Sequence, residues 1–202
     1  MGAQRMEFIE KGLYLVDRND NVIRKAKWEE VYNKKNKGLY TRVVHVWIFK
    51  ENKLLIQRRK NNLKIYPGFY ESSASGHVDF GESYSIAALR ELEEETGIKT
   101  RLYRIIKIKL KECKNICVLF MGFINKSEKK KIKINKGEVQ DVDFYSIREI
   151  RKMIKNKKLT PVFKELFKIF FNKKQNNYLN KLGNKVSKIV LKRINEIKDS
   201  EQ

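Results

Sequence analysis

The sequence has little cysteine, histidine or proline: its 202 residues include two of each. Cys113 and Cys117 are four residues apart in a run typical of a strand, which would hold them roughly 13 Å apart, too far for a disulfide. A structural zinc site would need more cysteine and histidine ligands than the chain offers near these two. The sequence therefore predicts two reduced thiols, as is usual in the cytoplasm.

Long apolar runs are also missing. No stretch reaches the roughly 20 residues needed to cross a bilayer, and the first residues contain no apolar segment typical of an export signal. The Met1-Gly2 start lacks the Ser or Thr that a myristoylation signal prefers, because Arg5 and Met6 stand there. We therefore expect a cytoplasmic protein that has no membrane partner.

Acidic residues are scarce beside basic ones. The chain has 24 Asp and Glu against 46 Lys and Arg, a formal net charge of +22. Such a field favours anionic partners, including nucleotides and RNA. The lysines run from Lys11 to Lys198 without clustering, so a lysine-rich background composition explains the same charge. The charge alone therefore identifies no partner.

The remaining composition suits a folded domain. With 41% hydrophobic and 11% aromatic residues, the chain can fill the core of one α/β domain with an appendage. Alternating and β-branched runs predict a hairpin over residues 13–23, a second hairpin over 41–58, and a loop with a short terminal strand over 60–75. Further patterns predict strands over residues 99–111, 116–124 and 139–145, a turn over 127–131, and helices over 28–32, 147–155 and 161–172.

The clearest helix is predicted over residues 83–96. Glu82 and Ser83 suit its start, and Gly97 suits a left-handed stop. Apolar residues recur at every third position in it, so we expect a buried stripe formed by Ile86, Leu89 and Leu92.

The composition changes after residue 171. Apolar residues at steps of three and four on a lysine-rich background predict a basic amphipathic helix in residues 172–202, appended to a domain over residues 1–171. Docking on the domain, dimerisation, and binding of a membrane or nucleic acid all remain open for it. The sequence does not distinguish a monomer from a homodimer.

Three acidic residues of the predicted helix carry the main chemical signal. Glu91, Glu94 and Glu95 stand at i, i+3 and i+4, so we expect their carboxylates to converge on one helix face. A hard divalent cation with oxygen ligands, Mg²⁺ or Mn²⁺, would remove their repulsion. Glu93 points elsewhere, and Arg90 can pair with Glu82 or with a ligand carboxylate. On the carboxylates alone, a charged surface helix is the better interpretation.

A longer pattern separates the two interpretations. The window from Gly76 to Ile98 matches G-x5-E-x7-R-E-U-x-E-E-x-G-U, in which U is aliphatic, at every specified position. By this motif the chain resembles the Nudix hydrolase superfamily. The resemblance implies an α/β (α+β type) fold with a mixed β-sheet between helices. It also implies Mg²⁺-dependent hydrolysis of a diphosphate linkage in a nucleoside diphosphate derivative or a similar small compound.

The resemblance also assigns roles by position. The metal ligands would be Glu91, Glu94 and Glu95, joined by the carbonyl of Ser75 and by an acidic residue of a later loop, Glu138, with Asp141 as second choice. Catalysis would involve Glu91, which also takes a proton from water, together with Glu94 and Arg90. The box would be shaped by Gly76, Glu82 and Gly97. Independently of the resemblance, the basic residues that flank the box in sequence are candidates to hold phosphates, although each is more often a surface residue: Arg42, Arg58, Arg59 and Lys64.

The flanking sequence narrows the resemblance. Residues 16–23, 42–49, 54–59 and 66–70 resemble the Nudix branch that contains type I isopentenyl-diphosphate isomerase, over roughly residues 10–170. The isomerase reaction is disfavoured because Ser75 stands at the position of a required cysteine and Tyr40 at that of a metal-binding histidine. A non-catalytic nucleotide- or RNA-binding protein on the same scaffold is the other alternative. The identity of the substrate is not encoded in the box.

Overall fold

The computed structural model describes residues 12–31, 34–110, 113–125, 132–156, 158–171, 192, 193 and 195–197. Its elements are β1 (Leu13–Val16), β2 (Val22–Ala26), α1 (Trp28–Val31), a 3-10 turn (Lys34–Asn36), β3 (Tyr40–Lys50), β4 (Lys53–Arg59), β5 (Tyr70–Glu71), β6 (Ala74–His77), α2 (Tyr84–Thr96), β7 (Leu102–Leu110), β8 (Asn115–Ile124), β9 (Val139–Ser146), α4 (Ile147–Asn156) and α5 (Pro161–Phe171). These bounds confirm the predicted strands and helices up to residue 171. The turn predicted over residues 127–131 lies largely outside the described residues.

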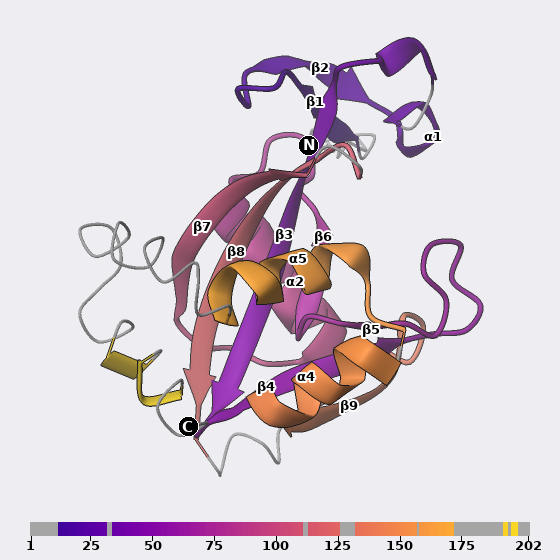
Figure 1. The fold of residues 1–202 in the computed structure, drawn as a ribbon. Coiled ribbons are helices and arrows are strands. Elements are labelled where there is room, and N and C mark those ends of the chain that lie inside the picture. Colours follow the sequence, from indigo (N-terminus) through magenta and orange to yellow (C-terminus); the bar gives the residue numbers. More distant parts are fainter. Residues whose placement is uncertain are drawn as a thin grey trace, which may run out of the picture.

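The long strand β3 lies at the centre of a mixed sheet (Figure 1). It pairs in parallel with β8 along Thr41–Lys50 and antiparallel with β1, β4 and β6. The strand β7 extends the sheet beyond β8, while β5 and β9 flank β4. The β3–β6 pairing is the part that matters for the site, because it places the start of the motif window against the sheet centre.

Helices cover both faces of this sheet. Alternate side chains of a strand point to opposite faces, and both faces of β3 are apolar and buried. One face, which includes Trp47 and Phe49, joins a core cluster with α4 and α5. The other, which includes Val44 and Val46, joins a cluster with α2. Figure 1 shows α4 and α5 in front of the sheet and α2 behind it, which confirms the predicted mixed sheet between helices.

Capping defines both ends of α2. The Ser83 hydroxyl accepts a hydrogen bond from the Ile86 N–H at 3.2 Å, and Gly97 ends the helix in the left-handed region at φ 69°. The predicted buried stripe is wrong for two of its three residues: Ile86 and Leu89 are 56% and 48% exposed, whereas Leu92 is buried as predicted. The face toward the sheet is made instead of Ala87, Ala88, Glu91, Leu92, Glu95 and Thr96. Small alanines let the helix backbone approach the sheet, and the two buried carboxylates take the space that larger apolar side chains would fill.

The segment β1–β2–α1 forms an N-terminal extension at one end of the sheet (Figure 1). The Asp20 carboxylate attaches it to the domain by ion pairs of 2.7 Å with both Arg42 and Lys107. The Tyr84 hydroxyl donates to the same carboxylate at 3.1 Å, and the Arg42 guanidinium lies 4.4 Å from the Tyr14 ring centroid. These contacts hold the extension beside the start of α2.

Most of the predicted C-terminal helix over 172–202 lies outside the described residues. Residues 192, 193 and 195–197 are helical, and the buried Ile197 belongs to the core cluster that contains α5. Within the described part of the chain, no helix is long and apolar enough to span a membrane.

Candidate active site

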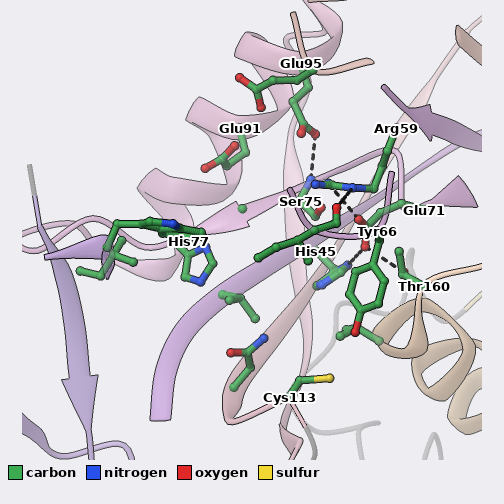
Figure 2. A pocket seen from close by; sticks show the side chains of 18 of the residues that line it. His45, Arg59, Tyr66, Glu71, Ser75, His77, Glu91, Glu95, Cys113 and Thr160 are labelled. Carbon is green, nitrogen blue, oxygen red and sulfur yellow. Dashed lines mark hydrogen bonds and ion pairs between the residues drawn. The ribbon is translucent and has the colours of Figure 1, made fainter. Parts of the chain in front are cut away.

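A cleft of about 610 Å³ opens beside the motif window. Its walls come from β3, the β5–β6 segment, α2, the start of β8, the residue before α5, and the N-terminal extension, which contributes Leu13 and Trp28. Figure 2 shows Glu91 and Glu95 of α2 on one side, with Glu71, Tyr66 and Thr160 further along the cleft. Two acidic side chains of the motif, Glu91 and Glu95, therefore line this cleft.

Glu91 lies against the backbone of Gly76. Its side chain is largely buried, and a Cβ built on Gly76 would overlap the carboxylate of Glu91. A side chain at residue 76 would therefore displace this carboxylate, which explains the need for glycine there. Burial raises the pKa of Glu91 to about 7, although the neighbouring Arg90 opposes this.

Glu95 is buried more deeply, at 3% exposure. One of its oxygens accepts hydrogen bonds from Gln57 Nε2 at 3.0 Å and from the Ser75 backbone N–H at 2.9 Å. Burial raises the pKa of Glu95 well above its usual range, and the nearby Glu91 carboxylate adds to the effect. Two carboxylates are thus held one helical turn apart in a place that disfavours two negative charges.

Arg90 fixes the arrangement of the surrounding acids. Its Nε and Nη2 donate to the two oxygens of Glu82 at 2.8 and 2.9 Å, which confirms the predicted pair. Its Nη1 donates to Glu91 at 2.8 Å and to Glu94 at 3.2 Å. Its Nη2 also donates to the carbonyl of His77 at 3.0 Å, so one guanidinium ties α2 to the loop that precedes it.

The three carboxylates predicted to converge do not all face the cleft. Glu94 has a side chain 53% exposed and lies beside Arg90, whereas Glu91 and Glu95 point into the domain. Within the described ranges, no three His, Cys, Asp or Glu side chains are close enough together to hold a metal ion. Arg90 Nη1 donates to both Glu91 and Glu94, whereas Gln57 and the Ser75 N–H both donate to Glu95, so the carboxylates do not share one set of partners.

The donor set nevertheless suits a hard divalent cation. Glu91, Glu95 and Glu138 line the same cleft, and Glu138 contributes to the raised pKa of both other acids. The buried Gln57 Oε1 has no hydrogen-bond partner among the described residues, which leaves one more oxygen beside Glu95. Carboxylates that line one cleft repel one another when they are ionised. Such a set of oxygen donors is what Mg²⁺ or Mn²⁺ prefers.

The predicted later-loop ligand also lies at the cleft. Glu138 is one of its lining residues and accepts a hydrogen bond from Asn135 Nδ2 at 3.3 Å. Asp141, the second choice, is exposed on β9 beside Arg58 and does not line the cleft. The structure therefore brings Glu138, not Asp141, to the motif carboxylates.

Of the four basic residues predicted to hold phosphate, Arg59 lines the cleft. Arg42 is engaged by Asp20 and two tyrosine rings at the extension, and Lys64 is exposed outside the cleft lining. Arg58 lies over the Tyr70 ring, with its Nε buried. For Arg42, Arg58 and Lys64 the expected phosphate contact is therefore not supported, because sequence proximity to the box did not place them at the cleft.

Several residues of the cleft were not predicted. They include the buried His45 and Glu71, together with Trp28, Lys114 and Thr160. Buried polar residues in a two-residue strand such as β5 give no periodic signal. A weak signal was present in the polar run Glu71-Ser72-Ser73, which sits between two strands and is fully buried.

The fold and the motif identify the family. A mixed sheet between helices is the fold that the resemblance implied, and the window from Gly76 to Ile98 runs from the end of β6 through a loop into α2. The model of the NUDIX domain matches residues 39–167. The chain belongs to the Nudix family.

Individual relatives agree with this assignment. An uncharacterized Nudix hydrolase of Clostridium acetobutylicum is 30% identical over 171 residues, covering 78% of this chain and 80% of the relative. A prenyl-diphosphate phosphatase of Methanosarcina mazei is 28% identical and covers 77% and 92%. An isopentenyl-diphosphate isomerase of Photorhabdus laumondii is 31% identical and covers 71% and 82%.

Other relatives match over a shorter part. The chain spans half or less of several curated relatives, down to 10% of Nudix hydrolase 3 of Arabidopsis thaliana, to which it is 41% identical over 80 residues. Among solved structures, a Deinococcus radiodurans protein has a TM-score of 0.67 at 16% identity and covers 78% of this chain and 97% of its own. This likeness shows the shared fold.

Proposed function

We propose that this protein is a divalent-metal-dependent hydrolase that cleaves a phosphoanhydride linkage in a small diphosphate compound. The observation that carries the proposal is the burial of Glu91 and Glu95 at the wall of a cleft, with Gly76 leaving room for the first carboxylate. Buried acids that repel one another lower stability unless a ligand compensates them. A purely structural helix would place apolar side chains at these positions.

Glu91, Glu95 and Glu138 would hold the cation, with Glu94 joining them after a change of its pairing with Arg90. Mg²⁺ is the expected ion, and Mn²⁺ has the same ligand preference. The bound ion would supply positive charge to the diphosphate oxygens and to the leaving group. Ser75, whose N–H holds Glu95, would offer its carbonyl from the same segment.

The chain's own groups define the remaining chemistry. Glu91 would take a proton from the attacking water as the water oxygen bonds to phosphorus and the bridging P–O bond breaks. Arg90 would keep this carboxylate in place through its bond of 2.8 Å. Arg59, which lines the cleft, would contact the substrate phosphates, and Lys114 lines the same cleft.

The relatives suggest two kinds of substrate. The Methanosarcina mazei relative is named for prenyl diphosphates, whereas the NUDIX domain of Shewanella oneidensis NrtR, with a TM-score of 0.52, was solved with ADP ribose. Both compounds contain a diphosphate. We favour a nucleoside diphosphate derivative, because the cleft beyond the carboxylates is lined by buried polar groups. The isomerase activity is disfavoured by Ser75 and Tyr40, as the sequence indicated.

The test is hydrolysis of a panel of diphosphate compounds with Mg²⁺ or Mn²⁺, with released phosphate and products measured. Glu91→Gln and Glu94→Gln should each lower kcat/KM by at least about 100-fold. Glu93→Gln is the matched control, because Glu93 lies on the same helix but pairs with the exposed Lys99. We expect this control to retain full activity.

Two results would contradict the proposal. One is absence of turnover across the panel with either metal, which would favour a nucleotide- or RNA-binding protein. The other is equal activity of Glu91→Gln, Glu93→Gln and the wild type, which would mean that the buried carboxylates take no part in the reaction.

A further inference from the structure

The cleft contains a third buried acid, which the proposed reaction does not use. Glu71, at the end of β5, is 5% exposed and lines the cleft away from the α2 carboxylates. Figure 2 shows its carboxylate between Arg59 and Thr160, with the Tyr66 ring beside it. An ionised side chain at this depth requires strong compensation.

The carboxylate of Glu71 accepts one hydrogen bond on each of its oxygens. Arg59 Nη1 donates to Oε2 at 3.3 Å, and the Thr160 hydroxyl donates to Oε1 at 3.0 Å. The Nδ1 of His45 is 3.7 Å from Oε1, too far for a hydrogen bond, and contacts the Ser72 hydroxyl at 2.9 Å instead. A carboxylate has about four acceptor positions, so each oxygen keeps capacity toward the cleft.

The surrounding elements hold these groups rigidly. Backbone hydrogen bonds join Tyr70 to Lys158 and Thr160 at 2.8 and 3.0 Å, which fixes β5 to the residues before α5. Tyr66 lines the same part of the cleft with a backbone φ of 50°, an uncommon conformation for a residue with a side chain. An aromatic ring and an oriented carboxylate therefore share one end of the cleft.

We propose that Glu71 is a specificity-determining residue that accepts hydrogen bonds from N–H groups of the substrate's non-phosphate part, and so selects a nucleobase over an apolar chain. This inference rests on the proposed function, because it assumes that a diphosphate lies at the α2 carboxylates. A prenyl chain at the same place would remove water from Glu71 without giving it a donor. A base supplies both N–H donors and a planar face for Tyr66.

The test compares substrates that share a diphosphate and differ in the attached group. We would measure kcat/KM for GDP, ADP, UDP, CDP and geranyl diphosphate with Mg²⁺, for the wild type and Glu71→Gln. The wild type should prefer its best nucleoside diphosphate to geranyl diphosphate by at least about 10-fold. Glu71→Gln should lower kcat/KM for that nucleotide by about 10- to 100-fold, and change the value for geranyl diphosphate by less than about 3-fold.

Two further variants separate recognition from folding. Glu165→Gln changes an acid of α5 that does not line this cleft, and should leave every value unchanged. Thr160→Val removes the hydrogen bond to Oε1 but keeps the Glu71 charge, and should lower kcat/KM for the nucleotide alone by about 3- to 10-fold. The second variant tests the proposal even if Glu71→Gln does not fold.

The outcomes are distinct. Loss of activity by the same factor on all five compounds would overturn the inference, since Glu71 would then act by positioning Arg59 on the phosphates. Preference of the wild type for geranyl diphosphate would also overturn it.

If no compound is hydrolysed, the proposed function fails, and calorimetric binding of GMP, AMP, UMP and CMP without metal decides the inference. Tighter binding of one of them to the wild type than to Glu71→Gln would support it, and equal binding would overturn it.

Discussion

Two carboxylates one turn apart on α2 are buried, and each depends on a different neighbour. Glu95 is held by hydrogen bonds from Gln57 and the Ser75 N–H, whereas Glu91 depends on the empty space above Gly76 and on Arg90. Gly76 therefore has two roles: it leaves space for the Glu91 carboxylate, and it shapes the backbone of the box. This distinction can be tested at single residues.

Gly76→Ala should displace the Glu91 carboxylate, because the new Cβ would overlap it. We expect kcat to fall by about 100-fold, the usual effect of a misplaced catalytic group, while thermal unfolding shows that the fold persists. Gly38→Ala is the control: a Cβ there meets no described atom within 4 Å, and because its φ of 86° disfavours alanine, we expect this variant to lose some stability but to keep its kcat. Full activity of Gly76→Ala would show that Glu91 acts from another position.

His45 gives a pH-dependent contribution to stability. Burial lowers its pKa from the usual value near 6.5, so the unfolded chain binds the proton more readily than the folded one. The contribution of neutral His45 to the free energy of unfolding is fully present above pH 6.5. It decreases as the pH falls toward the lower pKa that His45 has in the folded state, by at most about 1.4 kcal/mol per pH unit. Glu91 has the opposite sign, because its raised pKa makes the folded state bind a proton between the usual value and about 7.

The contributions of His45 and Glu91 to stability can be separated by comparing the wild type with a His45 variant. Urea unfolding of the wild type and His45→Asn in EDTA, from pH 7.5 to 5, should show the wild type losing stability relative to the variant below pH 6.5. The Glu91 contribution is common to both proteins and cancels in the difference. Parallel pH curves would mean that His45 is accessible to protons in the folded state.

At the scale of elements, α2 determines the site geometry through its ends and its buried face. Gly97 has φ 69°, and its N–H donates to the carbonyl of Glu93 at 2.8 Å. Gly97→Ala should lower the free energy of unfolding by about 1 kcal/mol, and by more if Lys133 cannot yield, because its Cβ would lie 3.3 Å from the new one. Urea denaturation measures this, and Gly97→Asn should be the milder change.

The sequence predicted most elements because their signals are local. Alternating apolar residues marked β3 and β4, and Ser83 and Gly97 marked the ends of α2. The buried face of α2 was mispredicted because Ile86 and Leu89 are more hydrophobic than Ala87 and Ala88. Contact between helix and sheet selected small residues instead, a choice that depends on tertiary structure.

The candidate site was predicted only in part for a related reason. The motif identified Glu91, Glu95 and Glu82 with Arg90, because their spacing lies within one segment. Glu71 and Thr160 are 89 residues apart in sequence, and their meeting depends on how β5 and α5 are placed. No local pattern contains that information.

At the scale of the whole molecule, the net charge of +22 should act on substrate capture. An attractive field raises the association rate of an anionic substrate and is screened by salt. We expect kcat/KM for a diphosphate substrate to fall by roughly 3- to 10-fold between 20 and 200 mM KCl, with kcat nearly constant. Glucose at matched osmolarity is the control, and an unchanged kcat/KM would show that the charge is only compositional.

The N-terminal extension lies outside the segment that defines the family. The family match covers residues 39–167, yet Leu13 and Trp28 form part of the cleft wall, and Asp20 anchors them. A homologous chain without this extension would keep the helix carboxylates but have a cleft open on that side. Sequence change in residues 12–31 can therefore alter this wall of the cleft without altering the helix carboxylates.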